Sequence, residues 1–580
     1  MSIEIKSSSE PYDVIIVGSG AGGGMASKIL SEAGLAVAVI EAGGDFDPAK
    51  DEDRTQLRYP WESPRRGNGT RIRPFGDFDA AIGGWDIEGE PYTKGKDTSF
   101  DWFRSRMVGG RTNHWGRISL RFGPNDFKRA SIDGLGHDWP IGYDDLKPYY
   151  DKVDKLIGVF GSKEGIFNEP DGFFLPPPKP RLHELFMMKG AKKASIPVIP
   201  SRLSVLTKPI NNDRGVCFFC RQCNRACQAY ADFSSGTCLV HPAMKKGKVD
   251  LYTNSMVRKV TTDDSGKANG VSFISKVDMK EYKLKARVVV LGASACESAR
   301  IMLNSKSKSH PDGIGNSSGM VGRYLHDSTG ADRMAILPDL IDRERYNEDG
   351  VGGMHVYTPW WLDNKKLDFA RGYHIEYWGG MGMPSYGVGF SMDTMRKFVK
   401  DEFGNPSPNG GYGEGLKKDI RRIQGSTLGM SGRGESIPMY HNYCEIDPNV
   451  VDKYGIPVLK FHYQWTEHEI KQAKHMHDTF EEILTNAGAV LMGEKPGPET
   501  KYGLATPGRI IHEVGTTRMG NNPATSVLNS NCQAHDCSNL FVVDAGPFVS
   551  QADKNPTWTI LALSWRTSDF IVSELKKKNI

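Results

Sequence analysis

Short apolar runs alternate with an amphipathic stretch at the N-terminal end of the chain. Residues 13–17 are rich in β-branched side chains and lead into the glycine-rich segment 18–23, residues 25–33 have helical periodicity, and residues 36–40 form a second apolar run. Such β-branched runs predict buried strands, and apolar residues three and four positions apart predict a helix. The pattern therefore predicts a strand–turn–helix–strand unit of about thirty residues.

Apolar runs of the same kind recur in distant parts of the sequence. Residues 286–291 predict a buried strand that leads into a short helix, and residues 540–543 predict a strand that precedes a long closing helix at 557–575. One discontinuous nucleotide-binding domain assembled from separated segments would leave the stretches between them to form a second domain. We assign residues 1–140, 215–330 and 500–580 to the first domain, with a cysteine-rich loop at 215–240, and residues 141–214 and 331–499 to the second.

Other periodicities define the remaining elements. Residues 249–252, 257–260 and 270–274 alternate between apolar and polar side chains in the manner of antiparallel strands, and residues 144–156 have an amphipathic helical pattern. The segment 466–469 has capping-box spacing before another amphipathic helix. We therefore expect an α/β Rossmann-like domain interleaved with a second, α+β domain.

Composition and charge narrow the class of protein. The 580 residues are 38% hydrophobic and 25% charged, as is typical of a globular enzyme with an ample core. The net charge is only +4, so we expect no nucleic-acid partner. No apolar run reaches the ~20 residues that a membrane helix needs. The N-terminal segment is polar and lacks the apolar stretch of a secretory signal.

The glycine-rich segment has the spacing of a dinucleotide-binding turn. Gly18, Gly20 and Gly23 form G-x-G-x-x-G between the first strand and the first helix. Glycines at these positions allow a tight turn and let the backbone approach a pyrophosphate at the helix N-terminus. Glu41 ends the second strand, where a carboxylate can bond the adenosine ribose. An acidic residue there fits FAD or NAD, so the turn alone leaves the cofactor open.

A second motif is a cluster of cysteines. Four of the nine cysteines lie within eleven residues: Cys217, Cys220, Cys223 and Cys227. Their spacing is that of a bacterial ferredoxin loop, although Gln228 replaces the usual proline. The crowding favours a metal site over a disulfide framework. An iron–sulfur cluster is the preferred interpretation, with structural zinc or simple thiols as alternatives, and Cys238 is an alternative fourth ligand.

Several long motifs occur in the order found in one enzyme family. They are the glycine turn with Glu41, VGGRTNHWG at 108–116, GIGNSS at 313–318, HEVGTTRMG at 512–520, VDAG at 543–546 and NPT at 555–557. On these motifs the chain resembles the glucose–methanol–choline (GMC) oxidoreductase family over most of its length. The resemblance implies FAD as the cofactor and the GMC fold, in which the FAD-binding Rossmann-like domain is interleaved with an α+β substrate domain that carries an antiparallel sheet.

The resemblance also implies two catalytic residues, His512 and Asn555. Oxidation of an alcohol needs a base for the hydroxyl proton while hydride leaves carbon for the flavin, and a neutral histidine suits that role. Asn555 can bond the same oxygen and hold it in line. The helix that begins here, with Pro556 in its first turn, would direct its positive end at the reduced flavin.

The family match places further residues around FAD. These are Arg111, Asn113, His114, Val257, Asp544, Asn555, Pro556 and Thr557. In sugar oxidases of the pyranose 2-oxidase type, a T-H-W segment carries a histidine bonded covalently to the flavin. Here Asn113 separates Thr112 from His114. A non-covalent contact is therefore the preferred interpretation at His114, with a covalent bond as the alternative.

Within the family, the chain resembles bacterial sugar dehydrogenases, particularly of the glucoside 3-dehydrogenase type. Related FAD sugar dehydrogenases carry a three-iron cluster on cysteines spaced like Cys217, Cys223 and Cys227. The additional Cys220 favours a 4Fe-4S over a 3Fe-4S cluster. The resemblance implies oxidation of a secondary alcohol of a sugar or glycoside at C3, and relay of electrons through the cluster to a c-type cytochrome.

The resemblance further implies a small chaperone-like subunit that carries the export signal and therefore a periplasmic location, with the cytoplasm as the alternative. Three other functions remain open: a flavin oxidase that uses oxygen, a gluconate- or glucose-type dehydrogenase of different regiochemistry, and an electron-transfer subunit without flavin chemistry. Aromatic residues also cluster in the second domain: Trp360, Trp361, Tyr373, Tyr377 and Trp378. They could stack on a pyranose or could be ordinary core residues.

Overall fold

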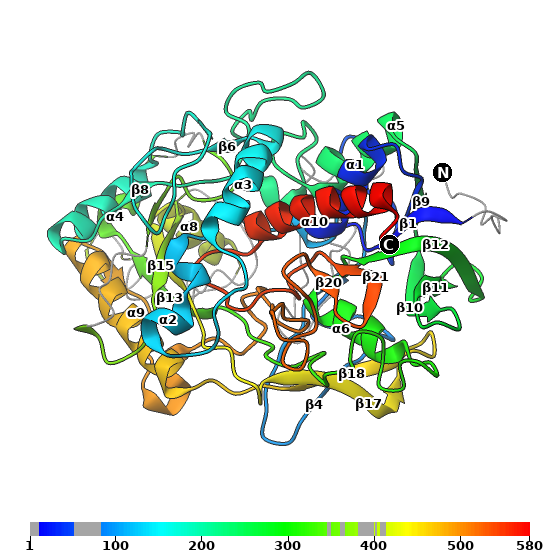
Figure 1. The fold of residues 1–580 in the computed structure, drawn as a ribbon. Helices are drawn as coiled ribbons and strands as arrows, with labels where there is room; N and C mark the ends of the chain where they lie inside the picture. The colour runs from blue at the N-terminus through cyan, green and yellow to red at the C-terminus, as the bar shows by residue number, and fades with distance from the viewer. Residues whose placement is uncertain are drawn as a thin grey trace.

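Two large sheets lie at opposite ends of the molecule (Figure 1). The structure is a computed structural model, and it describes residues 11–50, 83–344, 350–359, 366–380, 400, 403–405 and 413–580. Trp360 and Trp361 lie outside the described residues. In the described part, one sheet has eight strands and the other has six.

The eight-stranded sheet has a parallel centre and an antiparallel extension. Its strands are β1 (Tyr12–Val17), β2 (Val37–Ile40), β9 (Val249–Tyr252), β10 (Ser255–Thr262), β11 (Ala268–Ser275), β12 (Glu281–Leu291), β20 (Gln533–Ala534) and β21 (Cys537–Val542). Strands β9, β2, β1, β12 and β21 pair in parallel in that order. The first half of β12 also pairs antiparallel with β11, which pairs with β10. The predicted strand–turn–helix–strand unit is thus confirmed at β1, α1 (Ala21–Glu32) and β2.

One of the sequence expectations for this sheet is wrong. Residues 249–252 were expected to be antiparallel, but β9 runs parallel to β2, with Val37 opposite Val249. Alternation of apolar and polar residues over four positions indicates that a strand is half-buried. The direction of the strand depends instead on where the preceding chain enters the sheet. The other two segments, in β10 and β11, do pair antiparallel.

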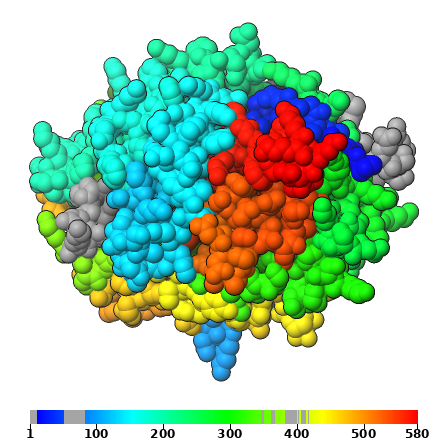
Figure 2. Space-filling model, in the orientation of Figure 1, coloured from blue at the N-terminus to red at the C-terminus, as the bar shows by residue number. Residues whose placement is uncertain are grey.

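Two helices from opposite ends of the sequence cover one face of the parallel strands. Val14 of β1 and Val290 of β12 are fully buried against Ala26 of α1 and Ile571 of α10 (Thr557–Lys577). Complete burial of such aliphatic side chains contributes about 1.5–3 kcal/mol each. Figure 2 shows the N-terminal and C-terminal segments adjoining at the surface. The opposite face belongs to the largest core cluster, which also contains residues of α6 (Ala295–Asn304), whereas α3 (Tyr143–Ile157) packs on α10.

The six-stranded sheet is antiparallel throughout. Its strands, in spatial order, are β19 (Val490–Leu491), β13 (Thr329–Ile336), β16 (Thr427–Gly434), β15 (Tyr373–Gly379), β14 (Val356–Thr358) and β8 (Ile199–Pro200). Helices α4 (Leu182–Lys193) and α9 (Glu467–Asn486) cover one face. Tyr373 and Tyr377 are fully buried on that face, which confirms that these two are core aromatics. Trp378, one residue further, lies on the other face.

The predicted capping box is confirmed at the start of α9. Thr466 accepts a hydrogen bond from the His468 amide, and Glu469 accepts one from the Thr466 amide at 2.7 Å. The remaining elements are short: α2 (Arg129–Asp133), α5 (His241–Lys246), α8 (Gly413–Ile423), and the sheets β17 (Tyr443–Val451)–β18 (Pro457–His462)–β4 (Thr93–Lys94), β3 (Gly83–Gly84)–β5 (Arg104–Ser105) and β6 (Val159–Phe160)–β7 (Phe174–Leu175). None of the helices in the described ranges is long and apolar enough to cross a bilayer. The predicted fold class is confirmed, and the domain limits remain a prediction.

Candidate active site

A cavity opens where the central parallel strands end. Its lining includes Gly18 after β1, Glu41 after β2, Gly292 after β12 and Asp544 after β21. In doubly wound sheets, ligands bind at this carboxyl edge. Eleven of the residues predicted to contact cofactor or substrate line the cavity: Gly18, Gly20, Glu41, Arg111, His114, Val257, His512, Asp544, Asn555, Pro556 and Thr557.

The backbone at the glycine turn leaves room for a ligand only at certain positions. Gly18 has φ +89°, and a Cβ there would lie 2.6 Å from the carbonyl oxygen of Gly292. A Cβ on Gly23 would lie 1.9 Å from the carbonyl oxygen of Gly18. In contrast, a Cβ on Gly20 would have no neighbour within 4 Å. Gly18 and Gly23 thus serve the turn itself, while Gly20 presents bare backbone to the cavity.

Glu41 is fixed by the turn that it faces. Its carboxylate accepts hydrogen bonds from the backbone amide of Ser19 at 3.1 Å, from the Ser19 hydroxyl at 2.6 Å and from the amide of Gly43 at 2.9 Å. A carboxylate has about four lone-pair sites, so it can still accept bonds from ribose hydroxyls. The bare backbone of Gly20 and this buried carboxylate fit the two halves of an adenosine pyrophosphate.

Two of the predicted cofactor residues do not line the cavity. Gly23 packs against the turn, as described above. The Asn113 amide donates to the carbonyls of Val108 and Gly110 and accepts from the Ser234 hydroxyl, so it holds the turn that carries Arg111 and His114. Gly23 and Asn113 therefore hold segments that line the cavity without lining it themselves.

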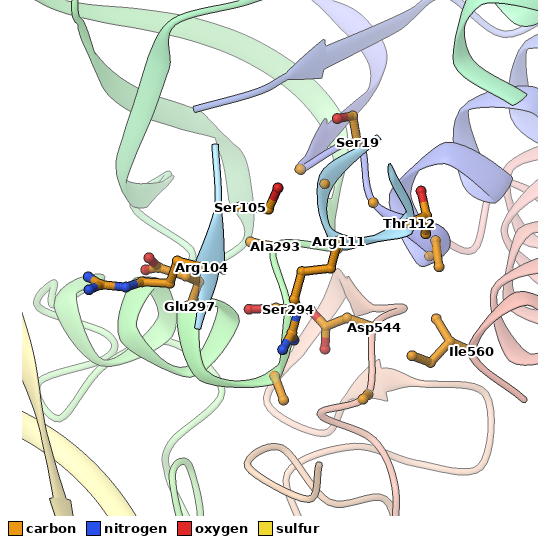
Figure 3. Close-up of a pocket in the computed structure, with 18 of the residues that line it drawn as sticks. Ser19, Arg104, Ser105, Arg111, Thr112, Ala293, Ser294, Glu297, Asp544 and Ile560 are labelled. Carbon is orange, nitrogen blue, oxygen red and sulfur yellow. The ribbon is translucent and has the colours of Figure 1, made fainter. Parts of the chain in front are cut away.

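Charged residues from opposite ends of the sequence meet in this cavity. Figure 3 shows Arg111 and Asp544 pointing into it. Arg111 forms an ion pair with Glu513 at 2.5 Å. Burial raises the pKa of Asp544 to about 6, although Ser298 and the Gly546 amide donate hydrogen bonds to it. The Asp544 carboxyl therefore titrates close to neutral pH, beside the predicted cofactor position.

The two predicted catalytic residues lie side by side. His512 Nε2 is 3.3 Å from the amide nitrogen of Asn555, and His512 Nδ1 is 3.0 Å from the hydroxyl of Ser328. An amide nitrogen can only donate, so His512 Nε2 holds the lone pair and Nδ1 donates its hydrogen to Ser328. Burial, together with the Arg433 guanidinium, lowers the pKa of His512 to about 3. The imidazole is therefore neutral at neutral pH and its Nε2 can accept a proton.

A buried carboxyl group holds the backbone of the segment that carries His512. Asp327 accepts hydrogen bonds from the amides of His512 at 2.9 Å and Gly508 at 2.8 Å. Burial and the nearby Glu513 raise the pKa of Asp327 to about 7. Pro556 and Thr557 follow Asn555 on the cavity wall and begin α10, so the positive end of that helix opens on the cavity.

The cysteine loop lies outside this cavity lining. Cys223 accepts a hydrogen bond from the Gly352 amide and Cys217 accepts one from the Phe219 amide, each at 3.3 Å. Burial raises the pKa of Cys217 to about 11 and raises that of Cys223 further. In the described part of the chain, no group of three or more His, Cys, Asp or Glu side chains is arranged to hold a metal. An iron–sulfur cluster at these cysteines therefore remains a prediction from the sequence.

Sequence reasoning missed several residues of the cavity wall. They include Ser19, Arg104, Ser105, Arg106, Ser294 and Glu297. Arg106 pairs with Glu297 at 2.5 Å and with Glu90 at 2.8 Å. Ser294 has φ 86° and ψ 155°, a conformation almost confined to glycine, and such strain concentrates at functional sites. In the sequence, the signal for such residues was a charged side chain inside an otherwise apolar segment. No short motif describes this pattern.

Comparisons with known proteins agree with this geometry. Two family models described as "GMC oxidoreductase" match residues 13–329 and 440–564. The chain is 28% identical to 2-methyl-1,2-propanediol dehydrogenase of Mycolicibacterium austroafricanum, over 97% of this chain and 96% of that protein. It is 26% identical to the fructose dehydrogenase large subunit of Gluconobacter japonicus, over 97% and 98%, and 25% identical to C-glycoside 3-oxidase of Arthrobacter globiformis, over 97% and 95%.

A solved structure supports the fold. The chain is similar to pyridoxine 4-oxidase from Mesorbium loti, with a TM-score of 0.59, 17% identity and coverage of 96% of this chain and 98% of that one. At this identity the likeness bears on architecture alone. The interleaving of a parallel nucleotide-type sheet with a separate antiparallel sheet is thus found in a second protein.

Proposed function

This chain belongs to the GMC oxidoreductase family, and from that premise we propose that it is a dehydrogenase that oxidises a secondary alcohol of a sugar or glycoside at C3. Membership implies FAD and oxidation of a CH–OH group. The narrower substrate is supported by similarity to fructose dehydrogenase and C-glycoside 3-oxidase. The observation that carries the proposal is the pairing of His512 Nε2 with Asn555 at the cavity wall.

The residues of this pair divide the work on the substrate hydroxyl. A hydroxyl placed between them would donate its hydrogen to His512 Nε2 and accept a hydrogen bond from the Asn555 amide. Ser328 fixes the imidazole tautomer by accepting from Nδ1. FAD, when bound, supplies the hydride acceptor. The N-terminus of α10 stabilises negative charge that develops beside it.

Anaerobic flavin reduction tests this assignment. Wild-type protein with bound FAD should lose its flavin absorbance when mixed with a reactive glycoside. His512→Ala should slow this reduction about 10²–10⁴-fold while FAD content is unchanged. His462→Ala is the matched control, because His462 pairs with Glu445 on the β17–β18 sheet. Retention of wild-type reduction rates in His512→Ala would remove His512 from the mechanism, and product NMR would decide whether C3 is the oxidised carbon.

The electron acceptor is a separate question. The sequence predicts an iron–sulfur relay to a c-type cytochrome, and the described residues contain no group already arranged to hold a metal, so no step proposed here passes through a cluster. Iron and acid-labile sulfide analysis of protein purified without oxygen decides the matter. Stoichiometric iron that disappears in Cys217→Ser would support the relay, and absence of iron would exclude it.

An oxidase is the second candidate, because some relatives are oxidases. Re-oxidation of the reduced flavin by air within a single turnover time would favour it over the dehydrogenase. We also propose, from the sequence resemblance alone, that the chain is carried to the periplasm by a small signal-bearing subunit. Cell fractionation and co-purification from the native host test both points.

A further inference from the structure

The two faces of the six-stranded sheet differ in chemistry. Alternate residues of β15 and β16 contribute Tyr373, Ile375 and Met430 to the apolar face under α4 and α9. The intervening residues put charged and polar groups on the other face. Strand geometry makes this alternation strict, because successive side chains point to opposite sides of a sheet.

Three rows of residues cross the polar face. The first contains His374, Arg433 and Gly330, the second Glu376, Ser431 and Asp332, and the third Trp378, Gly429 and Met334. The rows are linked by side-chain bonds. The Trp378 indole donates to the Ser431 hydroxyl at 3.0 Å, and the Ser431 hydroxyl donates to Asp332. A Cβ on Gly429 would lie 2.2 Å from the Trp378 ring, so glycine is what lets the indole lie across the strand.

This face reaches both segments that carry the catalytic residues. His374 Nδ1 bonds the backbone carbonyl of Asp553, two residues before Asn555. A Cβ on Gly330 would lie 2.3 Å from Ile510 and 3.4 Å from an Arg433 nitrogen, so Ile510 packs beside Arg433, and Ile510 lines the cavity with His512. The first row therefore adjoins the catalytic pair, and the third row lies further along the strands.

The charges on the face balance. Both ring nitrogens of His374 face acceptors, the Asp553 carbonyl and Glu376 at 3.3 Å, which favours the doubly protonated imidazolium. Glu376 also faces Arg433 at 3.7 Å, and Asp332 faces Arg433 at 3.4 Å. Two cations and two carboxylates give no net charge. Such a surface suits the many hydroxyls of a neutral sugar better than an acidic one.

We propose that this polar face is the substrate wall, on which Glu376 accepts hydrogen bonds from sugar hydroxyls beside the oxidised carbon and Trp378 packs against a second ring or aglycone of a glycoside. The proposal rests on the proposed function and deepens it, because it names a glycoside with two parts as the preferred substrate. Residues 374 and 378 are roughly 13 Å apart along the strand at about 3.3 Å per residue. This distance exceeds the width of one pyranose ring, so a ring held beside His374 and Arg433 in the first row leaves Trp378 to the group attached to it.

Kinetics with two neutral substrates test the wall. Flavin reduction would be measured with a disaccharide and with the methyl glycoside of its oxidised ring. Trp378→Ala should lower kcat/KM for the disaccharide about tenfold and that for the methyl glycoside less than about twofold. Glu376→Gln should raise KM for both roughly tenfold or more, because a charge-assisted hydrogen bond is lost. FAD content should be unchanged in both variants.

Two matched variants control for general damage. Glu445→Gln removes a carboxylate that pairs with His462 at 2.9 Å on the β17–β18 sheet. Trp565→Ala removes a half-buried indole of α10 that lies against Lys152. Both should leave the ratio of kcat/KM for the two substrates at the wild-type value. A Trp378→Phe variant, which keeps an aromatic face, should restore most of the preference for the disaccharide.

The outcomes separate this inference from the proposed function. If Trp378→Ala lowers kcat/KM equally for both substrates, or for neither, the proposed substrate wall is wrong. Reduction of the wild-type flavin by sugars would still support the proposed function. Binding is followed independently by quenching of tryptophan fluorescence on addition of the disaccharide. If no sugar reduces the wild-type flavin but Trp378-dependent quenching occurs, the proposed reaction fails and the wall stands. If quenching is identical in wild type and Trp378→Ala, the wall is wrong.

Discussion

The glycine turn and the cysteine loop both contain residues in the left-handed backbone conformation, but the types of residue differ. In the turn this conformation falls on Gly18, at φ +89°. In the loop it falls on Phe219, Arg221 and Ala226, each at φ 61–62°. A non-glycine residue costs roughly 1–2 kcal/mol in this region. The turn is therefore relaxed, whereas the loop holds strain that its surroundings must overcome.

This difference explains why the residue spacing of the glycine turn predicts positions around the cavity, whereas the spacing of the cysteine loop does not predict where its thiols lie. The turn joins β1 to α1, two elements packed on all sides, so its residue spacing translates directly into positions around the cavity. The part of the cysteine loop that carries the four cysteines, residues 217–227, contains one short turn of 3₁₀-helix, Cys223–Arg225, and an isolated bridge between Cys220 and Gly350. Spacing within such a loop does not determine where four thiols point.

The largest effect is expected at the turn, from Gly23→Ala. Its Cβ would lie 1.9 Å from the Gly18 carbonyl oxygen and 3.3 Å from Ile16, and backbone cannot yield there as a flexible side chain would. We expect loss of FAD together with destabilisation of the apoprotein by about 3 kcal/mol or more. Denaturant unfolding of the apoprotein and flavin content measure the two losses.

Gly20→Ala separates folding from cofactor binding. Gly20 has φ −64° and open space at its Cβ position, so the apoprotein should unfold within about 1 kcal/mol of wild type. Its methyl group would nevertheless project into the cavity and weaken FAD binding. Equal destabilisation of both variants would show that the turn is not rigid in the way argued here.

A smaller effect is expected from Glu41→Gln. The substitution keeps the shape but removes the charge that accepts from Ser19 and Gly43. Loss of charge-assisted hydrogen bonds should weaken FAD binding about tenfold to a hundredfold. Titration of apoprotein with FAD measures this change. Glu32→Gln on α1, whose partner Lys28 is on the same helix, should leave affinity unchanged, and a matching loss there would point to a general effect of charge.

The pH dependence of flavin reduction tests whether burial lowers the pKa of His512. Burial and Arg433 lower the pKa of His512 to about 3, so the imidazole stays neutral as pH falls from 8 to 5. The base is lost only as pH falls through its own pKa. Titration of His512 should therefore change the rate constant at saturating substrate less than about threefold over this range, whereas a histidine of pKa 6.5 would lose about 30-fold. Because Asp327 and Asp544 have pKa values of about 7 and about 6, an acidic limb near 6.5 contradicts the burial argument only if it persists in Asp327→Asn and in Asp544→Asn.

The parts of the fold that sequence predicted share a local cause. The β1–α1–β2 unit, α9 with its Thr466 cap, and α10 follow from periodicity and capping within each segment. In the six-stranded sheet β8 near residue 199 pairs with β14 near residue 356, and β13 near residue 329 pairs with β19 near residue 490. No local pattern encodes those pairings. For the same reason the direction of β9 could not be predicted.

The candidate site divides in the same way. His512 and Asn555 were found through long motifs and lie together in the structure. Ser328, which fixes the imidazole tautomer, immediately precedes β13, and His374, which contacts the Asp553 carbonyl, lies in β15 of the same sheet. Their relation to His512 exists only after the two sheets are assembled. Side-chain alternation on β15 could have separated Trp378 from Tyr377, had the strand been assigned.

The smallest effect is expected in the cysteine loop, from Ala226→Gly. Ala226 has φ 62° and ψ 137°, close to a region that is almost confined to glycine. Glycine removes this strain but adds freedom to the unfolded chain, so the net gain should be about 1 kcal/mol. Ala229→Gly, at an ordinary φ in the same loop, should lose a similar amount. Measured unfolding free energies that fall for both variants would show that the loop is as relaxed as the turn. A gain at Ala226 alone would show that the loop holds strain which the glycine turn avoids.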